Sequence, residues 1–212
     1  ERLTGHIAIG HTRYSTTGSS HVRNAQPLIS KGPDVEVALG HNGNVVNAQA
    51  LRDELMGLGC TFTTSSDSEI VAHLITNAPA STWEDRVAYA MRRIEGAYSL
   101  ALMTTEFLMA IRDPLGVRPL CLGKLNGGWV IASETCALDH IGATYLRDVE
   151  PGEAVMIDDE GPRTIYRREA ESGPAMCVFE HIYFARPDSV LSGKLVYSSR
   201  LAMGAGLARE FP

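Results

Sequence analysis

The segment Gly40-His41-Asn42-Gly43-Asn44 contains residues that could stabilise a developing negative charge. Gly43 has no Cβ, so the backbone can come close to a ligand and present its amide hydrogen. Asn42 adds a side-chain donor beside it, and two such donors can form an oxyanion hole. An ordinary Asn-Gly turn has the same letters, and it is the better interpretation when this segment is taken alone.

Two further polar segments supply a cation and an anion. Arg13 lies in the segment 10–18, and arginine can bind a carboxylate through two parallel hydrogen bonds, although a surface ion pair is an alternative. Asp67 lies in the segment 65–69, in the first turn of a predicted helix, where the helix dipole favours a carboxylate. Its alternative role is to cap that helix. A carboxylate site, an ammonium site and an oxyanion hole together could hold a free amino acid and attack its side-chain amide.

Strands and helices are predicted to position these segments. Residues 6–11 and 35–40 are apolar and β-branched, and they predict strands that deliver polar loops, with Gly40 to Asn44 at the mouth of the second strand. Asn47 is expected to begin a helix that Gly59 ends, and its predicted buried face consists of Ala48, Leu51, Leu55 and Leu58.

Two capping boxes predict the starts of two more helices. Ser66 and Glu69 are expected to satisfy each other's backbone amides, and Thr82 to Asp85 repeats the pattern. The helix that begins at Thr82 is expected to end at Gly96, and its predicted buried face consists of Val87, Ala90, Met91 and Ile94.

From Ala97 onward, short strand-like segments alternate with turns. The turns at Asn126-Gly127-Gly128 and Asp159-Glu160-Gly161 predict hairpins. The segments are too close together for helical crossovers, so the sheets must be largely antiparallel. Helices first and strands later indicate an α+β layered domain, with a boundary expected near residues 172–185.

Composition excludes several classes of function. The 212 residues carry 25 acids against 19 Lys and Arg, a net charge of −6, with no basic stripe of the kind that nucleic-acid binders use. The longest apolar stretch, 97–111, is interrupted by polar residues and cannot span a membrane. The 4 cysteines are far apart, which favours a reduced, cytoplasmic protein over a disulfide framework or a zinc site.

In this order and spacing, Thr-Arg-Tyr-x-Thr, His-Asn-Gly-Asn and Ser-Asp-x-Glu resemble the class II glutamine amidotransferases, whose nucleophile is the N-terminal residue. Four other segments resemble the branch of that family that aminates 5-phosphoribosyl 1-diphosphate in purine synthesis. They are Asn24-Ala25-Gln26-Pro27, Arg112 to Leu120, Ala132 to Asp139 and Glu180 to Ser189. The resemblance extends over essentially the whole chain.

The resemblance implies a role for each site residue. Arg13 would bind the α-carboxylate of L-glutamine, with Thr16 in support. Asp67 would bind the α-ammonium, and Asn42 with Gly43 would form the oxyanion hole. Asp113 and Arg118, by contrast, are expected to shape a turn near the site.

The resemblance also implies the architecture and the domains. The expected fold is a four-layer α/β/β/α sandwich of two largely antiparallel sheets. Residues 1–180 would be the glutaminase domain, and residues 181–212 a linker and the start of a phosphoribosyltransferase domain. Tyr183 and Arg186 would lie between the two domains, and the family suggests a homotetramer.

The nucleophile of this family is the cysteine at the mature N-terminus, whose own α-amino group acts as the base. We expect that cysteine upstream of Glu1, so the chain is interpreted as part of a longer protein and is expected to be inactive alone. Cys60, Cys121 and Cys136 are predicted to be packing residues. Cys177 stands where some members supply one ligand of a 4Fe–4S cluster, and Mg²⁺ is expected with the diphosphate substrate in the second domain.

The implied reaction makes 5-phosphoribosylamine from 5-phosphoribosyl 1-diphosphate and glutamine. Another class II amidotransferase, of the glucosamine-6-phosphate synthase or asparagine synthetase type, is an alternative. Two features weigh against this alternative: Tyr14 stands at a position where the resemblance implies Trp in the glucosamine enzyme, and the segment 183–189 matches the other branch. A glutamine-binding module without catalysis is a third possibility.

Overall fold

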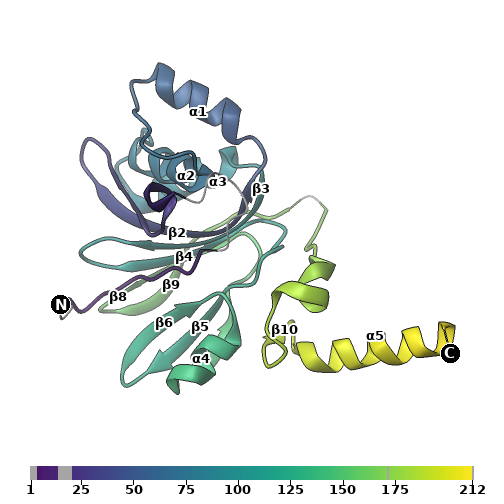
Figure 1. Ribbon diagram of the computed structural model, residues 1–212. Coiled ribbons are helices and arrows are strands. Elements are labelled where there is room, and N and C mark those ends of the chain that lie inside the picture. The colour runs from purple at the N-terminus through teal and green to yellow at the C-terminus, as the bar shows by residue number, and fades with distance from the viewer. Residues whose placement is uncertain (1–3, 14–20, 171, 212) are drawn as a thin grey trace.

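Two β-sheets lie face to face between two layers of helices in the computed structural model, which describes residues 4–13, 21–170 and 172–211 (Figure 1). The larger sheet contains, in spatial order, β1 (Leu28–Lys31), β2 (Glu36–Val45), β3 (Gly96–Met103), β4 (Leu108–Arg112), β8 (Glu153–Asp158) and β9 (Gly161–Arg167). The smaller sheet has the order β6 (Gly128–Ala132), β5 (Cys121–Leu125) and β7 (Thr144–Asp148).

Three helices cover the outer face of the larger sheet, namely α1 (Ala48–Gly57), α2 (Asp67–Thr76) and α3 (Trp83–Arg93). A short helix, α4 (Thr135–Ile141), packs on the smaller sheet (Figure 1). The recorded strand pairings within both sheets are antiparallel. The layers therefore follow the order α/β/β/α, and the predicted fold class is confirmed.

Each interface between layers has its own apolar cluster. The helices and the larger sheet share a cluster that includes Leu74 and Met109, and the two sheets share one that includes Ala110 and Leu122. Cys121 and Leu138 belong to a third cluster, between the smaller sheet and α4. Side chains alternate along a strand, so neighbours such as Met109 and Ala110 serve different clusters.

Thr82 is confirmed as the N-cap of α3, although Asp85 accepts from its hydroxyl and not from its N–H, and the cap predicted for α2 is wrong in its partners. The hydroxyl of Thr82 accepts a hydrogen bond from the N–H of Asp85 (3.1 Å). Ser66 instead accepts from Ser68 N–H (3.3 Å). Glu69 reaches back to the N–H groups at positions 63 and 64, 2.8 Å each, because the preceding chain turns those donors and two threonine hydroxyls toward it.

Two other expectations fail for reasons of packing. Residues 6–11 form no strand. The Ile9 side chain lies 3.6 Å from where a Cβ on Gly40 would be, so the segment buries apolar surface over the sheet face without strand pairing. Leu58 is 69% exposed because α1 ends at Gly57, one residue before it.

The last part of the chain is joined to the sandwich by both backbone and side-chain contacts. It contains η2 (Glu180–Phe184), β10 (Val190–Leu191), β11 (Lys194–Leu195) and α5 (Val196–Glu210), and α5 extends away from the sheets (Figure 1). Ala175 N–H donates to Leu115 O (2.8 Å). The predicted division into domains 1–180 and 181–212 stays a prediction.

The two residues predicted to lie between domains are exposed. The backbone N–H of Arg186 donates to Glu134 Oε2 (2.8 Å), and its guanidinium pairs with Asp188 (2.7 Å). Tyr183 is 69% exposed and packs against the Phe184 ring. Their interdomain role is also still a prediction.

Candidate active site

The polar segment Gly40 to Asn44 lies inside β2, and its prediction as a loop at the mouth of a strand is wrong. The antiparallel register with β3 runs without a break from Ala38 opposite Met103 to Val45 opposite Gly96. Strand pairing therefore outweighs the turn preference of Asn-Gly. On the other side, β1 pairs with β2 only as far as Leu39, so the edge beyond that residue is available to side chains.

Side chains accept hydrogen bonds from alternate N–H groups along this edge. His41 N–H donates to Gln26 Oε1 (2.6 Å), and Val45 N–H donates to Asp67 Oδ2 (3.0 Å). Gly43 lies midway between them. Alternate N–H groups of an antiparallel strand point to the same side, so the N–H of Gly43 is directed to the edge between these two side chains. That direction suits the backbone donor of an oxyanion hole.

The backbone of β3 explains why position 43 is a glycine. A Cβ at Gly43 would lie 2.0 Å from Ala97 O and 2.8 Å from Tyr98 Cα. The expected reason was close approach to a ligand, whereas the structure shows close approach of the neighbouring strand. Any larger residue would push β2 away from β3 and would move the N–H with it.

Asn42 lies on the opposite face of β2 from His41, and Arg118 holds its side chain. Nε and Nη2 of Arg118 donate to Asn42 Oδ1 at 3.2 and 2.9 Å. Since the oxygen faces two donors, Nδ2 is the group of this amide that can donate to a substrate.

Asp113 shapes the neighbouring turn as predicted, but Arg118 does more than that. Asp113 is fully buried and accepts hydrogen bonds from the N–H groups of Tyr98, Leu115 and Val117. Burial raises the pKa of Asp113, and these N–H groups oppose the rise. Arg118, at the end of the same turn, reaches the predicted oxyanion hole instead.

Asp67 begins α2, as predicted, and is 6% exposed. Its Oδ1 lies 3.8 Å from His41 Nδ1. Burial lowers the pKa of His41, and this effect exceeds the opposing one of Asp67. His41 is therefore neutral near pH 7, and its contact with Asp67 is not an ion pair.

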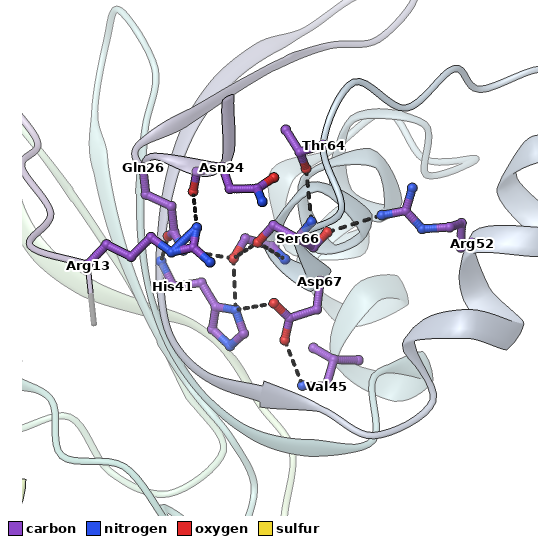
Figure 2. Close-up of polar contacts among 10 residues, drawn as sticks. Arg13, Asn24, Gln26, His41, Val45, Arg52, Thr64, Ser66 and Asp67 are labelled. Atoms are coloured by element: carbon purple, nitrogen blue, oxygen red, sulfur yellow. Dashed lines mark hydrogen bonds and ion pairs between the residues drawn. The ribbon is translucent and has the colours of Figure 1, made fainter. Parts of the chain in front are cut away.

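Arg13 is tied to the start of α2 through Asn24. Arg13 Nη1 donates to Asn24 O (2.8 Å), and Asn24 Nδ2 donates to Ser65 Oγ (3.0 Å). Figure 2 shows Arg13 and Asp67 on opposite sides of His41, as expected if they hold the two charged ends of one amino acid. Thr16 and Tyr14 lie outside the described residues.

A buried polar network links these parts, and the sequence did not predict it. Ser68 Oγ accepts from Gln26 Nε2 (3.0 Å) and lies 3.2 Å from His41 Nδ1. The network connects β2 to the first turn of α2 (Figure 2). The only available signal was that Ser68 falls inside the polar segment 65–69 and Gln26 inside the segment Asn24-Ala25-Gln26-Pro27.

None of the described cysteines lies among these residues. Cys121 is buried in β5 and Cys136 in α4, and burial raises the pKa of Cys121 to about 12, so it stays a thiol. Cys60 lines a small pocket with His73 and Asn77, and Cys177 lies before η2. In the described part of the chain, no group of three or more His, Cys, Asp or Glu residues could hold a metal ion. Of the helices described there, none is long and apolar enough to cross a bilayer.

The fold and these residues define a glutamine-handling domain. Residues 11–140 match the glutamine amidotransferase domain family, and the chain belongs to that family. Over the whole chain, the sequence is 46% identical to an amidophosphoribosyltransferase of Rhizobium etli and 48% identical to one of Synechococcus elongatus. The chain spans 43% and 44% of the lengths of these relatives.

Solved structures agree with this assignment. The glutamine phosphoribosylpyrophosphate amidotransferase from B. subtilis, complexed with ADP and GMP, matches with a TM-score of 0.85 and 41% identity. The match covers 94% of this chain and 43% of that one. A second structure, described as the allosteric regulatory enzyme of purine biosynthesis, matches with a TM-score of 0.86 and 42% identity.

Proposed function

We propose that this chain is the glutamine-binding part of an amidophosphoribosyltransferase. The protein would release ammonia from glutamine and use it to convert 5-phosphoribosyl 1-diphosphate to 5-phosphoribosylamine and diphosphate, at the start of purine synthesis. The edge of β2 carries this proposal, because it directs the Gly43 N–H between the side chains of Gln26 and Asp67. The match of the whole chain to amidophosphoribosyltransferases supports it.

Each residue has a role that follows from its chemistry. Arg13 binds the α-carboxylate of glutamine through two hydrogen bonds, with Thr16 in support, and Asp67 binds the α-ammonium. These contacts bring the side-chain amide of glutamine to Asn42 and Gly43. When a nucleophile attacks that amide carbon, the oxygen gains negative charge, and the two donors stabilise it.

The nucleophile in this proposal is an N-terminal cysteine upstream of Glu1. Its thiol proton passes to its own α-amino group, and the thiolate bonds to the amide carbon. The resulting α-ammonium then gives that proton to the amide nitrogen as the C–N bond breaks, so the leaving group departs as ammonia. Water then hydrolyses the thioester to glutamate. The burial of Cys121 in β5 and of Cys136 in α4 supports this choice, since neither element forms the β2 edge.

Cofactors and assembly belong to the proposal as well. Mg²⁺ would accompany the diphosphate in a phosphoribosyltransferase domain. The described residues do not fit a 4Fe–4S cluster, which needs four ligands, because Cys177 has no group of further ligands around it. Cys177 would serve one only with cysteines outside this chain. We also expect a cytoplasmic homotetramer.

The test uses the full-length protein. We expect release of diphosphate from 5-phosphoribosyl 1-diphosphate with either glutamine or ammonium as the nitrogen source. Amination of fructose 6-phosphate would identify the glucosamine-6-phosphate synthase type, and ATP-dependent amination of aspartate the asparagine synthetase type. Glutamine binding without release of glutamate would identify a non-catalytic module.

A further inference from the structure

We propose that Arg118 is a positioning residue of the oxyanion hole, which fixes the amide of Asn42 and links it to Glu180 at the start of η2. This inference rests on the proposed glutamine chemistry. It adds a physical connection between the oxyanion donor and the C-terminal segment of the chain.

The guanidinium of Arg118 contacts three groups at once. Nε and Nη2 donate to Asn42 Oδ1, and Nη1 lies 2.6 Å from Glu180 Oε1. Its central carbon lies 5.0 Å from the centre of the Phe184 ring, a cation–π distance. Asn42 belongs to β2, whereas Glu180 and Phe184 belong to η2. One side chain therefore joins the site to a distant part of the chain.

The contact with Asn42 determines which end of the amide can donate. An asparagine amide can turn about its terminal bond, and its oxygen and nitrogen occupy nearly the same space. Two guanidinium donors facing Oδ1 favour one orientation, because the reversed amide would set N–H groups against N–H groups. Arg118 thus keeps Nδ2 available for the substrate oxygen. A cation on Oδ1 also polarises the amide and strengthens Nδ2 as a donor.

The backbone of Arg118 is fixed independently of its guanidinium. Its carbonyl oxygen accepts from Ser99 Oγ (3.1 Å) and from Arg112 Nε (2.8 Å). Ser99 also lies opposite Asn42 in the β2–β3 register. The backbone of Arg118 is therefore anchored to β3 and β4, beside the strand β2 that carries Asn42, and its guanidinium makes the link to η2.

Burial raises the pKa of the Glu180 carboxyl, and the charge of Arg118 opposes that rise. The side chain of Glu180 is 4% exposed, and Oε1 accepts no hydrogen bond of good geometry within the described part of the chain. It forms an ion pair with Arg118 Nη1 at 2.6 Å. A buried carboxylate that loses its cation is strongly destabilised. A movement of η2 would therefore draw Arg118 with it and change the orientation of Asn42.

The experiment is a double-mutant cycle in the full-length protein, with kcat and KM for glutamine hydrolysis as readouts. Arg118→Met should lower kcat about 10- to 100-fold and change KM less than about 3-fold, because it disorders one oxyanion donor. In an Asn42→Ala background, where there is no amide to orient, the same change should lower kcat less than about 2-fold. Arg118→Lys should fall between Met and wild type, because an ammonium cannot reproduce the planar contact.

Arg147→Met is the matched control. Arg147 pairs with Glu153, another buried carboxylate (1% exposed), and makes no recorded contact with Asn42. Arg147→Met should lower the thermal midpoint but leave kcat unchanged. Glu180→Gln removes the ion pair with little change of shape, and it should lower kcat with Arg118 present but have no effect with Met at position 118.

Three outcomes would overturn the inference: wild-type kcat in Arg118→Met, equal losses with and without Asn42, or equal losses in the Arg118 and Arg147 variants. If Arg118→Met does not fold, the kcat of Glu180→Gln decides in the same way. The proposed function fails separately, if the wild-type protein releases no glutamate from glutamine.

Discussion

Replacement of Gly43 by alanine is expected to damage the site by moving one strand. The new Cβ would start 2.0 Å from Ala97 O, and real Cβ atoms do not approach such an oxygen closer than 3.0 Å, so β2 and β3 must separate by roughly 1 Å. The obstacle is backbone, which cannot rotate away. We expect a stability loss of about 3 kcal/mol, the upper end for overpacking, and a fall in the thermal midpoint of about 6–12 °C. A displacement of about 1 Å at the donor should lower kcat for glutamine hydrolysis about 100-fold.

Gly57→Ala is the control, because a Cβ at Gly57 in α1 would meet nothing within 4 Å. Its effect on stability should stay within about 1 kcal/mol, and in the favourable direction, since alanine is the better helix former. The assay compares thermal midpoints and glutamate release for the two full-length variants. Unchanged kcat in Gly43→Ala would refute the idea that the spacing of β2 and β3 sets the position of the donor.

The remaining predictions concern binding, the isolated chain and pH. Arg13→Ala should raise KM for glutamine and leave synthesis from free ammonia intact; equal loss of both activities would exclude its role at the carboxylate. The purified 212-residue chain should release no glutamate above background, because none of its described cysteines lies at the site; measurable release would refute this. Burial lowers the pKa values of His41, His73 and His11. The unfolded chain then binds more protons as pH falls through about 6.5, so the thermal midpoint should be lower at pH 5.5 than at pH 7.5, and a higher midpoint would contradict it.

Local signals in the sequence were enough to predict many of the helix starts, the turns and the direction of strand pairing. Asp67 at the start of α2, the cap at Thr82 and the hairpin at Asn126 each depend on a few neighbouring residues, and the structure has all three. The antiparallel pairing followed from the spacing of the strand-like segments, because they leave no room for crossovers. Interactions of this range can be read from a single sequence.

Contacts between distant residues could not be predicted in this way. Arg118 meets Asn42 across 76 residues, and Gln26 meets Ser68 across 42. The extension of β2 through Gly43 has the same cause, since pairing of Gly43 with Tyr98 on β3 overrides the local preference for a turn. Residue types could suggest an oxyanion hole, but what orients it depends on tertiary packing.

The most direct test of the central claim is the rate of glutamine hydrolysis by full-length Asn42→Ala. If Asn42 donates to the oxyanion, kcat should fall about 10²- to 10³-fold, with little change in KM. Synthesis from free ammonia should continue, because it does not pass through this site. A kcat equal to that of the wild-type protein would contradict the assignment of Asn42, and with it the account of how this edge of β2 handles glutamine.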